Sequence, residues 1–203
     1  PNAHEVSEIE LVAMCDLDGD RARAAAERWG VGAWYTDYEA MFAREGLDAV
    51  IVVGPPGMMQ PITRHALGRG LHVFTEKPPA LTSAQARELV DASRSAGVTG
   101  MVATHWRHSP PVTKAQELVK GDGFGAPGHC LGWFYAPGPV NPIQAWGDLD
   151  ALDSYLLAQG VHLVDCTRAL MGDIAEVSAG ARHTEDVFDS CSVSLKFANG
   201  ATG

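Results

Sequence analysis

Residues 66–78 decide the fold of this chain, and they read Ala-Leu-Gly-Arg-Gly-Leu-His-Val-Phe-Thr-Glu-Lys-Pro. Gly70 ends a helical segment, and Leu71–Thr75 has the apolar and aromatic composition of a buried strand. The charged pair Glu76-Lys77 and then Pro78 follow that strand directly. In doubly wound parallel sheets, groups just past the carboxyl ends of the strands bind the ligand. The stretch therefore predicts a helix–strand unit with candidate ligand-binding residues at the carboxyl edge of its sheet.

The neighbouring segments alternate between strand and helix patterns. Asp18 precedes an Ala-rich run as an N-cap, and Thr82 or Ser83 caps a later one. Helices separating the strands by about a dozen residues predict βαβ units and a parallel sheet. Strands are expected at Ile9–Cys15, Ala49–Val53, Leu71–Thr75 and Val98–Thr104, and helices at Arg21–Trp29, Pro61–Arg69 and Ala84–Ala96.

The second half of the chain has a different pattern, and we place a domain boundary near residue 122. Residues 1–122 form the expected dinucleotide-binding domain, and residues 123–203 form a second domain for substrate binding or oligomerisation. In the second domain, the alternation of apolar and polar residues in the last run suits an antiparallel sheet with one covered face. Its expected elements are a strand at His129–Tyr135, a long helix at Leu156–Met171 and β-rich runs at Ala175–Ala181 and Val187–Phe197.

Composition excludes several classes of function. The 203 residues include 15 Lys and Arg against 25 Asp and Glu, a formal net charge of −10. Such a balance argues against nucleic acid or an anionic membrane as the main partner. The longest apolar runs are far shorter than the roughly 20 residues of a membrane span. The four cysteines form no C-x-x-C pair, and we expect free thiols in a reducing, cytoplasmic setting.

These motifs resemble those of the Gfo/Idh/MocA family of NAD(P)-dependent oxidoreductases. The family's run reads roughly A-L-x-x-G-K-H-V-x-x-E-K-P, and residues 66–78 match it with Leu71 in the lysine position. Further matches in the same order cover nearly the whole chain. They are the strand ending at Asp16, the loop Gly54-Pro55-Pro56, the segment Arg107–Pro110 and the segment Gln159–Asp165.

The resemblance implies a fold and a set of site residues. The fold is α/β, with a Rossmann-type doubly wound parallel sheet and an α/β second domain whose sheet is largely antiparallel. Lys77 is implied to contact both the substrate hydroxyl and the nicotinamide ribose, and His162 to act as the general base. The implied cofactor-binding residues are Asp16, Gly54, Pro55, Pro56, Glu76, Lys77 and Arg107.

Asp16 also carries an argument about the cofactor. A carboxylate at the end of a strand accepts hydrogen bonds from an adenosine ribose and repels a 2′-phosphate. Leu17 adds no positive charge, and Arg21 belongs to the following helix. A turn or cap carboxylate is the alternative role of Asp16, although Asp18 is the better cap. We therefore expect NAD, with NADP less favoured.

The chain departs from the family pattern at several points. The dinucleotide glycine fingerprint belongs about 20 residues before its acidic partner, which places it ahead of Pro1. The similar run Gly121–Ala126 follows a helical stretch and precedes a strand, so it is not that fingerprint. We expect a piece of a longer protein, lacking the first strand of the sheet and the end of the second domain.

Two further departures concern the chemistry. Ala158 stands where the family usually has Asp one helical turn before the base, and Met59 stands where it often has His. The expected function is hydride transfer between a nicotinamide cofactor and a secondary alcohol or ketone of a sugar or cyclitol. A non-catalytic sugar- or cofactor-binding sensor is the alternative. We expect no metal site and a homo-oligomer assembled through the sheet of the second domain.

Overall fold

A computed structural model describes residues 5–135, 149, 151–184 and 187–203. The chain divides into two compact units that interleave along the sequence. The first contains the residues up to Val52 together with Pro61–Phe74 and Arg87–Met101. The second contains Val53–Gln60, Thr75–Ala86 and Val102–Gly203.

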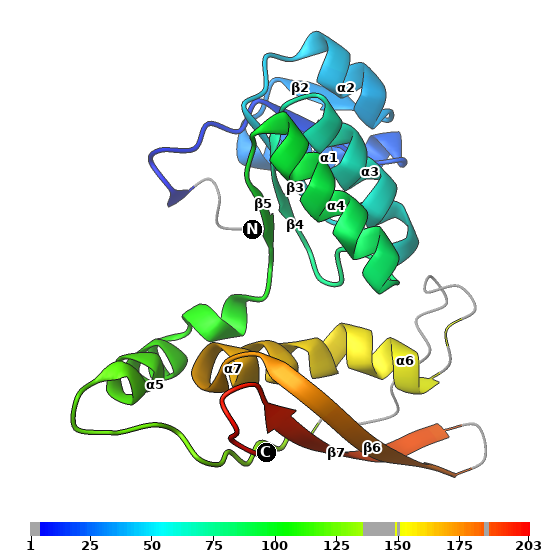
Figure 1. The fold of residues 1–203 in the computed structure, drawn as a ribbon. Helices are drawn as coiled ribbons and strands as arrows, with labels where there is room; N and C mark the ends of the chain where they lie inside the picture. Colours follow the sequence, from blue (N-terminus) through cyan, green and yellow to red (C-terminus); the bar gives the residue numbers. More distant parts are fainter. Residues whose placement is uncertain (1–4, 136–148, 150, 185–186) are drawn as a thin grey trace. The chain divides into compact units, whose positions relative to one another are not determined.

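The strands of the first half form two small sheets (Figure 1). Strands β1 (Ala13–Cys15) and β2 (Ala33–Tyr35) pair in parallel. Strands β3 (Ala49–Val52), β4 (His72–Thr75) and β5 (Gly100–Val102) form a second sheet in the order β3-β4-β5. Among the described residues no strand joins β1 to β3.

The register of the second sheet is that of a parallel Rossmann-like sheet. The amide of Val73 donates to the carbonyl of Thr99, and the amide of Ala103 donates to the carbonyl of Thr75. Both pairs advance in the same direction along β4 and β5, as parallel pairing requires. The predicted α/β fold class is therefore confirmed.

Four helices connect these strands: α1 (Gly19–Trp29), α2 (Tyr38–Arg44), α3 (Pro56–Gly68) and α4 (Ser83–Ala96). The predicted cap of α1 is confirmed, because Asp18 accepts hydrogen bonds from the amides of Asp20 and Arg21. Thr82 caps α4, where its hydroxyl accepts from the amide of Gln85 at 3.2 Å. The side chain of Gln85 accepts from the amide of Thr82 in return, at 3.2 Å, which completes a capping box.

The core of the first unit forms where helices meet the sheet. Val50 and Val73 are buried on β3 and β4, Leu67 on α3 and Leu89 on α4. Gly100 on β5 allows a close approach, since an added Cβ would lie 3.8 Å from Leu67 and 3.8 Å from Ser93. Helices α3 and α4 therefore both pack on the β5 end of the sheet.

The second unit contains most of the remaining elements. Its helical segments are η2 (His105–His108), α5 (Pro110–Lys120), α6 (Ala151–Tyr155), the π-helical turn η3 (Leu156–Gly160) and α7 (Val161–Met171). Figure 1 shows α6, η3 and α7 as one continuous helical path. The long strands β6 (Ile174–Thr184) and β7 (Val187–Phe197) form an antiparallel ribbon beside it.

The β6–β7 ribbon is covered only at the end that contains Phe197. Phe197 is buried with Met171 of α7 and Ala201, whereas Ser192, Ser194 and Lys196 are exposed. Beyond β7 the chain turns back, and the amide of Phe197 donates to the carbonyl of Ala201 at 2.9 Å. Val177 and Val193 are 63% and 45% exposed, so the face predicted to be covered is buried near Phe197 and open further along the ribbon.

The strand expected at His129–Tyr135 does not form, and this prediction was wrong. The segment has a single bridge, between His129 and Thr202. Its side chains nevertheless keep a two-residue alternation. An added Cβ on Gly132 would lie 2.9 Å from Leu163, whereas Leu131, Trp133 and Tyr135 are exposed. The pattern for one covered face is present, but the described chain supplies no neighbouring strand to complete a ladder.

Other differences concern element boundaries. The run expected at Ile9–Cys15 is a strand only over Ala13–Cys15, and α3 begins at Pro56 rather than Pro61. Both prolines favour a helix start, and the earlier one prevails here. The sequence prediction also omitted β2 and α2. No helix among the described residues has the length and hydrophobicity to cross a bilayer.

Candidate functional site

Lys77 directly follows β4 and lies against the π-helical turn of the second unit. Its amide donates to the Glu76 carboxylate at 3.0 Å, and its Nζ donates to the carbonyl of Ala158 at 2.7 Å. The Lys77–Pro78 peptide bond is cis. The backbone amide and the ammonium group of Lys77 are thereby both held by hydrogen bonds. The ammonium group lies at Ala158, four residues before His162.

The π-helical turn explains how a backbone carbonyl serves this lysine. Ala158 is 6% exposed and lies within Leu156–Gly160, immediately before α7. Turns of this kind are rare and occur frequently at functional sites. The position at which the family usually has Asp therefore contributes its carbonyl oxygen, and Ala158 precedes His162 by about one helical turn.

His162 is the most buried ionisable side chain of this region, with 3% exposure. The indole of Trp106 stacks on its ring, with centroids 4.6 Å apart and planes 13° apart. The ring of His105 meets it edge-on, with centroids 5.1 Å apart and planes at 70°. Its Nδ1 is buried without a hydrogen-bond partner among the described residues. The imidazole is thus fixed in orientation and retains a free ring nitrogen.

The surroundings of His162 favour its neutral form. Burial lowers the pKa of the imidazole below its usual value, and the nearby positive charge of Lys77 and the ring of His105 lower it further. The carboxylates of Asp165 and Glu76 oppose this shift without reversing it. At neutral pH the ring is therefore able to accept a proton.

Arg107 forms a two-pronged ion pair with Asp165 on α7. Its Nε donates to Oδ2 at 2.6 Å, and Nη2 donates to Oδ1 and, at 3.4 Å, to the Asp165 carbonyl. The Arg107 side chain is 34% exposed and that of Asp165 15%. The hydrogen bonds to Asp165 raise the pKa of Arg107. The guanidinium predicted to bind cofactor is thus held against α7, one turn beyond His162.

The loop Gly54-Pro55-Pro56 follows β3 directly, as Glu76 and Lys77 follow β4. Since β3 and β4 are neighbours in a parallel sheet, both groups lie at its carboxyl edge. Gly54 and Pro55 are exposed there, and Pro56 is buried at the start of α3. Met59 is 1% exposed inside α3, so its side chain is part of the core.

Asp16 follows β1 in the first unit, and its surroundings differ from the prediction. The amide of Asp18 donates to its Oδ1 at 2.9 Å, and Nη2 of Arg21 lies 3.1 Å from the same oxygen. Arg21 also lies 3.5 Å from Asp18. Because Arg21 begins the first turn of α1, its side chain reaches back over the strand end. The Asp16 carboxylate therefore has the Arg21 guanidinium beside it. The sequence analysis assigned Arg21 to the following helix and expected no positive charge at Asp16.

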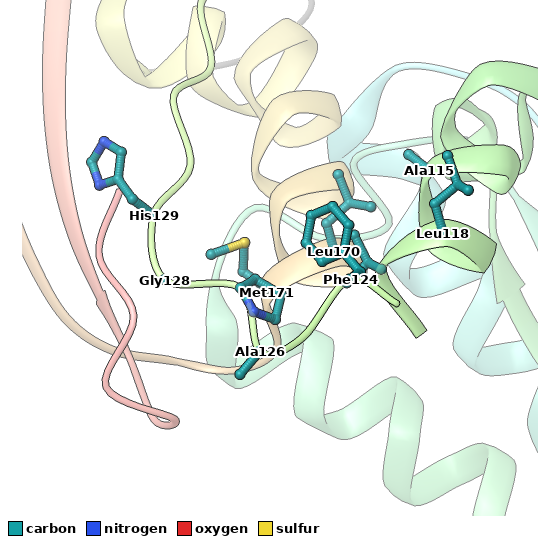
Figure 2. Close-up of a pocket in the computed structure, with 10 residues that line it drawn as sticks. Ala115, Leu118, Phe124, Ala126, Gly128, His129, Leu170 and Met171 are labelled. Atoms are coloured by element: carbon teal, nitrogen blue, oxygen red, sulfur yellow. The ribbon is translucent and has the colours of Figure 1, made fainter. Parts of the chain in front are cut away.

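An apolar cavity of about 390 Å³ lies apart from these groups, between α5, α7 and the loop before His129. Figure 2 shows Leu118 on α5, Leu170 and Met171 on α7, and His129 at the other side. The cavity contains none of the predicted site residues. Its ionisable residue, His129, is hydrogen-bonded to the Thr202 hydroxyl at 2.9 Å. The chemistry-bearing groups are at the sheet edge and not in this cavity.

The donor set suits a nicotinamide cofactor better than a metal. Within the described residues, no group of three or more His, Cys, Asp or Glu side chains is arranged to hold a metal ion. The four cysteines are free thiols. Within the second unit, the Lys77 ammonium group and the buried imidazole of His162 with its orphaned nitrogen suit an alcohol hydroxyl. Residues 121–135 include no helix, so the run Gly121–Ala126 does not open one.

The sequence prediction missed the aromatic group around His162. It assigned no role to His105 or Trp106. Their place after β5, at the carboxyl edge of the sheet, is the signal that could have drawn attention to them. Trp106 also contacts Phe134, with ring centroids 5.4 Å apart. The rings that contact His162 thus come from η2, and Phe134 contacts one of them, Trp106.

Comparison with family models covers almost the whole chain. Residues 1–104 match the model described as "Oxidoreductase family, NAD-binding Rossmann fold". Residues 112–203 match the "GFO/IDH/MocA C-terminal domain". The two matches lie on either side of the end of η2 and the start of α5.

Individual relatives agree with this assignment. The chain is 32% identical over 202 residues to D-xylose 1-dehydrogenase (NADP(+)) 2 of Haloferax volcanii, covering 98% of this chain and 62% of that protein. It is 28% identical over 202 residues to D-apiose dehydrogenase of Paraburkholderia graminis, covering 98% and 53%. A crystal structure of a dehydrogenase from Chromobacterium violaceum superposes with a TM-score of 0.88 at 30% identity, covering 98% of this chain and 57% of that one. The chain thus spans little more than half the length of the proteins it matches.

Proposed function

The chain belongs to the Gfo/Idh/MocA family of oxidoreductases, and on that premise we propose that the complete protein transfers hydride between a nicotinamide cofactor and a sugar hydroxyl or keto group. The observation that carries the proposal is the buried imidazole of His162. It has an unpartnered Nδ1 and lies one helical turn beyond the carbonyl that anchors Lys77. The D-xylose and D-apiose dehydrogenases among its relatives support a sugar as the substrate.

His162 is proposed to accept the hydroxyl proton of the substrate. Its burial and the nearby charge of Lys77 keep the ring neutral, which is the state a general base needs. The stacked indole of Trp106 fixes the plane of the ring. Fixed orientation lowers the entropic cost of bringing base and hydroxyl together.

Lys77 is proposed to bind the substrate oxygen and stabilise the negative charge that develops on it. An Nζ that donates one hydrogen bond to Ala158 has further N–H groups to offer. The bound cofactor supplies the hydride acceptor or donor. Asp16, Gly54, Pro55, Pro56 and Glu76 are proposed to hold it, and the NAD-binding description of the first family model supports NAD.

A non-catalytic sensor is the second candidate, and two observations favour it. Ala158 supplies no carboxylate to the base, and Met59 is buried in α3 where the family often has histidine. Both candidates predict sugar or cofactor binding. Only the enzyme requires His162 to titrate and to exchange protons with the substrate.

Replacement of His162 by Asn in the complete protein separates the two candidates. For the enzyme, the rate of hydride transfer in a single turnover with a pentose substrate should fall roughly 10²–10⁴-fold. The affinity for NADH should stay the same. His108→Asn is the matched control, because His108 is exposed on η2. If the wild-type protein turns over none of a panel of aldoses and keto-sugars, the result favours the sensor.

Three further features belong to the same proposal. We propose a cofactor-binding domain up to residue 122 and a second domain after it; the matched ranges 1–104 and 112–203 support two domains in this order, with the change between residues 104 and 112. The exposed polar face of the β6–β7 ribbon is the proposed site of homo-oligomer contact. A cytoplasmic setting suits the free cysteines.

A further inference from the structure

The environment of His162 presents a difficulty for any proton-transfer role. Its side chain is 3% exposed, and the Trp106 indole covers one ring face. An imidazole that accepts a substrate proton must return it to solvent before the next turnover. Water has little direct access to this ring, so a neighbouring group must carry the proton.

Most charged neighbours of His162 are already engaged. The carboxylate of Asp165 is paired through both oxygens with Arg107. Lys77 donates to the carbonyl of Ala158, and as an ammonium ion it has no lone pair to accept a proton. The Glu76 carboxylate accepts from the Lys77 amide through one oxygen, and the ring contacts of His162 are with His105 and Trp106 instead. The indole of Trp106 has a donor and no acceptor.

His105 differs from all of these groups. It is exposed, and its ring meets that of His162 edge-on with centroids 5.1 Å apart. Its Nδ1 lies 3.3 Å from the carbonyl of Ala103. Because a carbonyl oxygen only accepts, that contact places the proton on Nδ1 and leaves the lone pair on Nε2. His105 thus combines contact with the buried ring, access to solvent and a free acceptor nitrogen.

We propose that His105 is the proton exit of the site, relaying to solvent the proton that His162 takes from the substrate. The inference rests on the proposed function of His162. In the oxidative direction the hydroxyl proton moves to His162, which becomes an imidazolium. The proton then passes to Nε2 of His105 and on to water, so that both rings are neutral again. In the reductive direction the same path supplies the proton.

His105→Phe tests the relay, because phenylalanine keeps an aromatic edge against His162 and removes the titrating nitrogens. Stopped-flow measurement of the complete protein in weak buffer follows NADH absorbance and a pH-indicator dye in the same reaction. We expect hydride transfer in the first turnover to stay within about twofold of the wild type. Proton release should slow by roughly 10²-fold, the lower end of what positioned proton transfer contributes.

Two more variants complete the experiment. In His105→Ala, added imidazole should restore the rate of proton release by occupying the space of the lost ring. His108→Asn, on the same short helix, should release protons at the wild-type rate. Release at the wild-type rate in His105→Phe would overturn the relay. If His162→Asn also left the first turnover unchanged, the proposed function itself would fail, so the two failures are distinguishable.

Discussion

The ion pair between Arg107 and Asp165 has a cost that can be worked out from its exposure. Replacing Arg107 by Ala removes the paired hydrogen bonds and leaves the Asp165 carboxylate, 15% exposed, without a counter-charge. Breaking a fully buried pair costs about 3–5 kcal/mol, whereas exposed pairs contribute about 0–1 kcal/mol. Since the Arg107 side chain is 34% exposed, we expect a loss of about 2–3 kcal/mol in the free energy of unfolding.

A double-mutant cycle of Arg107→Ala and Asp165→Asn isolates the pair. Equilibrium unfolding of the complete protein in urea, followed by far-ultraviolet circular dichroism, supplies each free energy. The matched control is the cycle of Arg168→Ala and Asp173→Asn, because that pair is 51% and 77% exposed. We expect its coupling energy to lie within about 0–1 kcal/mol. Equal coupling in the two cycles would refute the structural role of Arg107.

The same variants test the predicted contact of Arg107 with the cofactor. NADH fluorescence titration measures the dissociation constant in Arg107→Ala and in Asp165→Asn. If Arg107 binds the cofactor directly, the first variant weakens NADH binding more than the second. Unchanged NADH affinity in Arg107→Ala would remove Arg107 from the cofactor-binding set and leave it as a clamp on α7.

Four other outcomes are expected. The folded-state pKa of His162 lies below the unfolded value of about 6.5. The stability that the neutral ring contributes is therefore present above about pH 6.5 and is lost as the pH falls through the folded-state pKa. In the same pH range kcat/KM should fall with decreasing pH in the wild type, and this fall should be absent in His162→Asn. Lys77→Met should lower kcat and raise the dissociation constant of NADH together, whereas an effect on one alone would contradict its double assignment. Ala158→Asp places a carboxylate one turn before His162 and should raise the pH at which kcat/KM falls by about 1–3 pH units. An unchanged pH profile would show that a charge at residue 158 does not affect the pKa of His162. Arg21→Ala leaves the charge of Asp16 unopposed, so NADPH binding should weaken relative to NADH, and a constant ratio of the two dissociation constants would contradict this.

The helices with strong local signals could be predicted from sequence. Asp18 and Thr82 cap their helices as predicted, because a side-chain oxygen needs only the adjacent amides as partners. The strand at His129–Tyr135 could not be predicted, because a strand depends on a neighbour that local pattern does not reveal. Strand β2 is a short run with no clear alternation, and its pairing with β1 is what orders it.

The candidate site divides in the same way. Lys77 and His162 stand in local motifs that resemble those of the family, and this resemblance singled them out. The stack of Trp106 on His162 and the ion pair from Arg107 to Asp165 join segments far apart in sequence. Neither follows from composition or spacing. Sequence placed Arg21 in its helix correctly and still missed its contact with Asp16, since that contact depends on a side-chain direction.

Ala158 shows why an absent side chain need not mean absent chemistry. A carboxylate at this position would raise the pKa of His162 and make it the stronger base. In this chain burial and Lys77 lower that pKa instead, so the ring is neutral over a wider range of pH but accepts protons less avidly. The Lys77 ammonium needs no side chain at position 158, because it is anchored by the backbone carbonyl exposed in the π-helical turn. A base works best when its pKa is near the working pH. If His162 is the base that we propose, the substitution therefore displaces the pH optimum of the site toward acid.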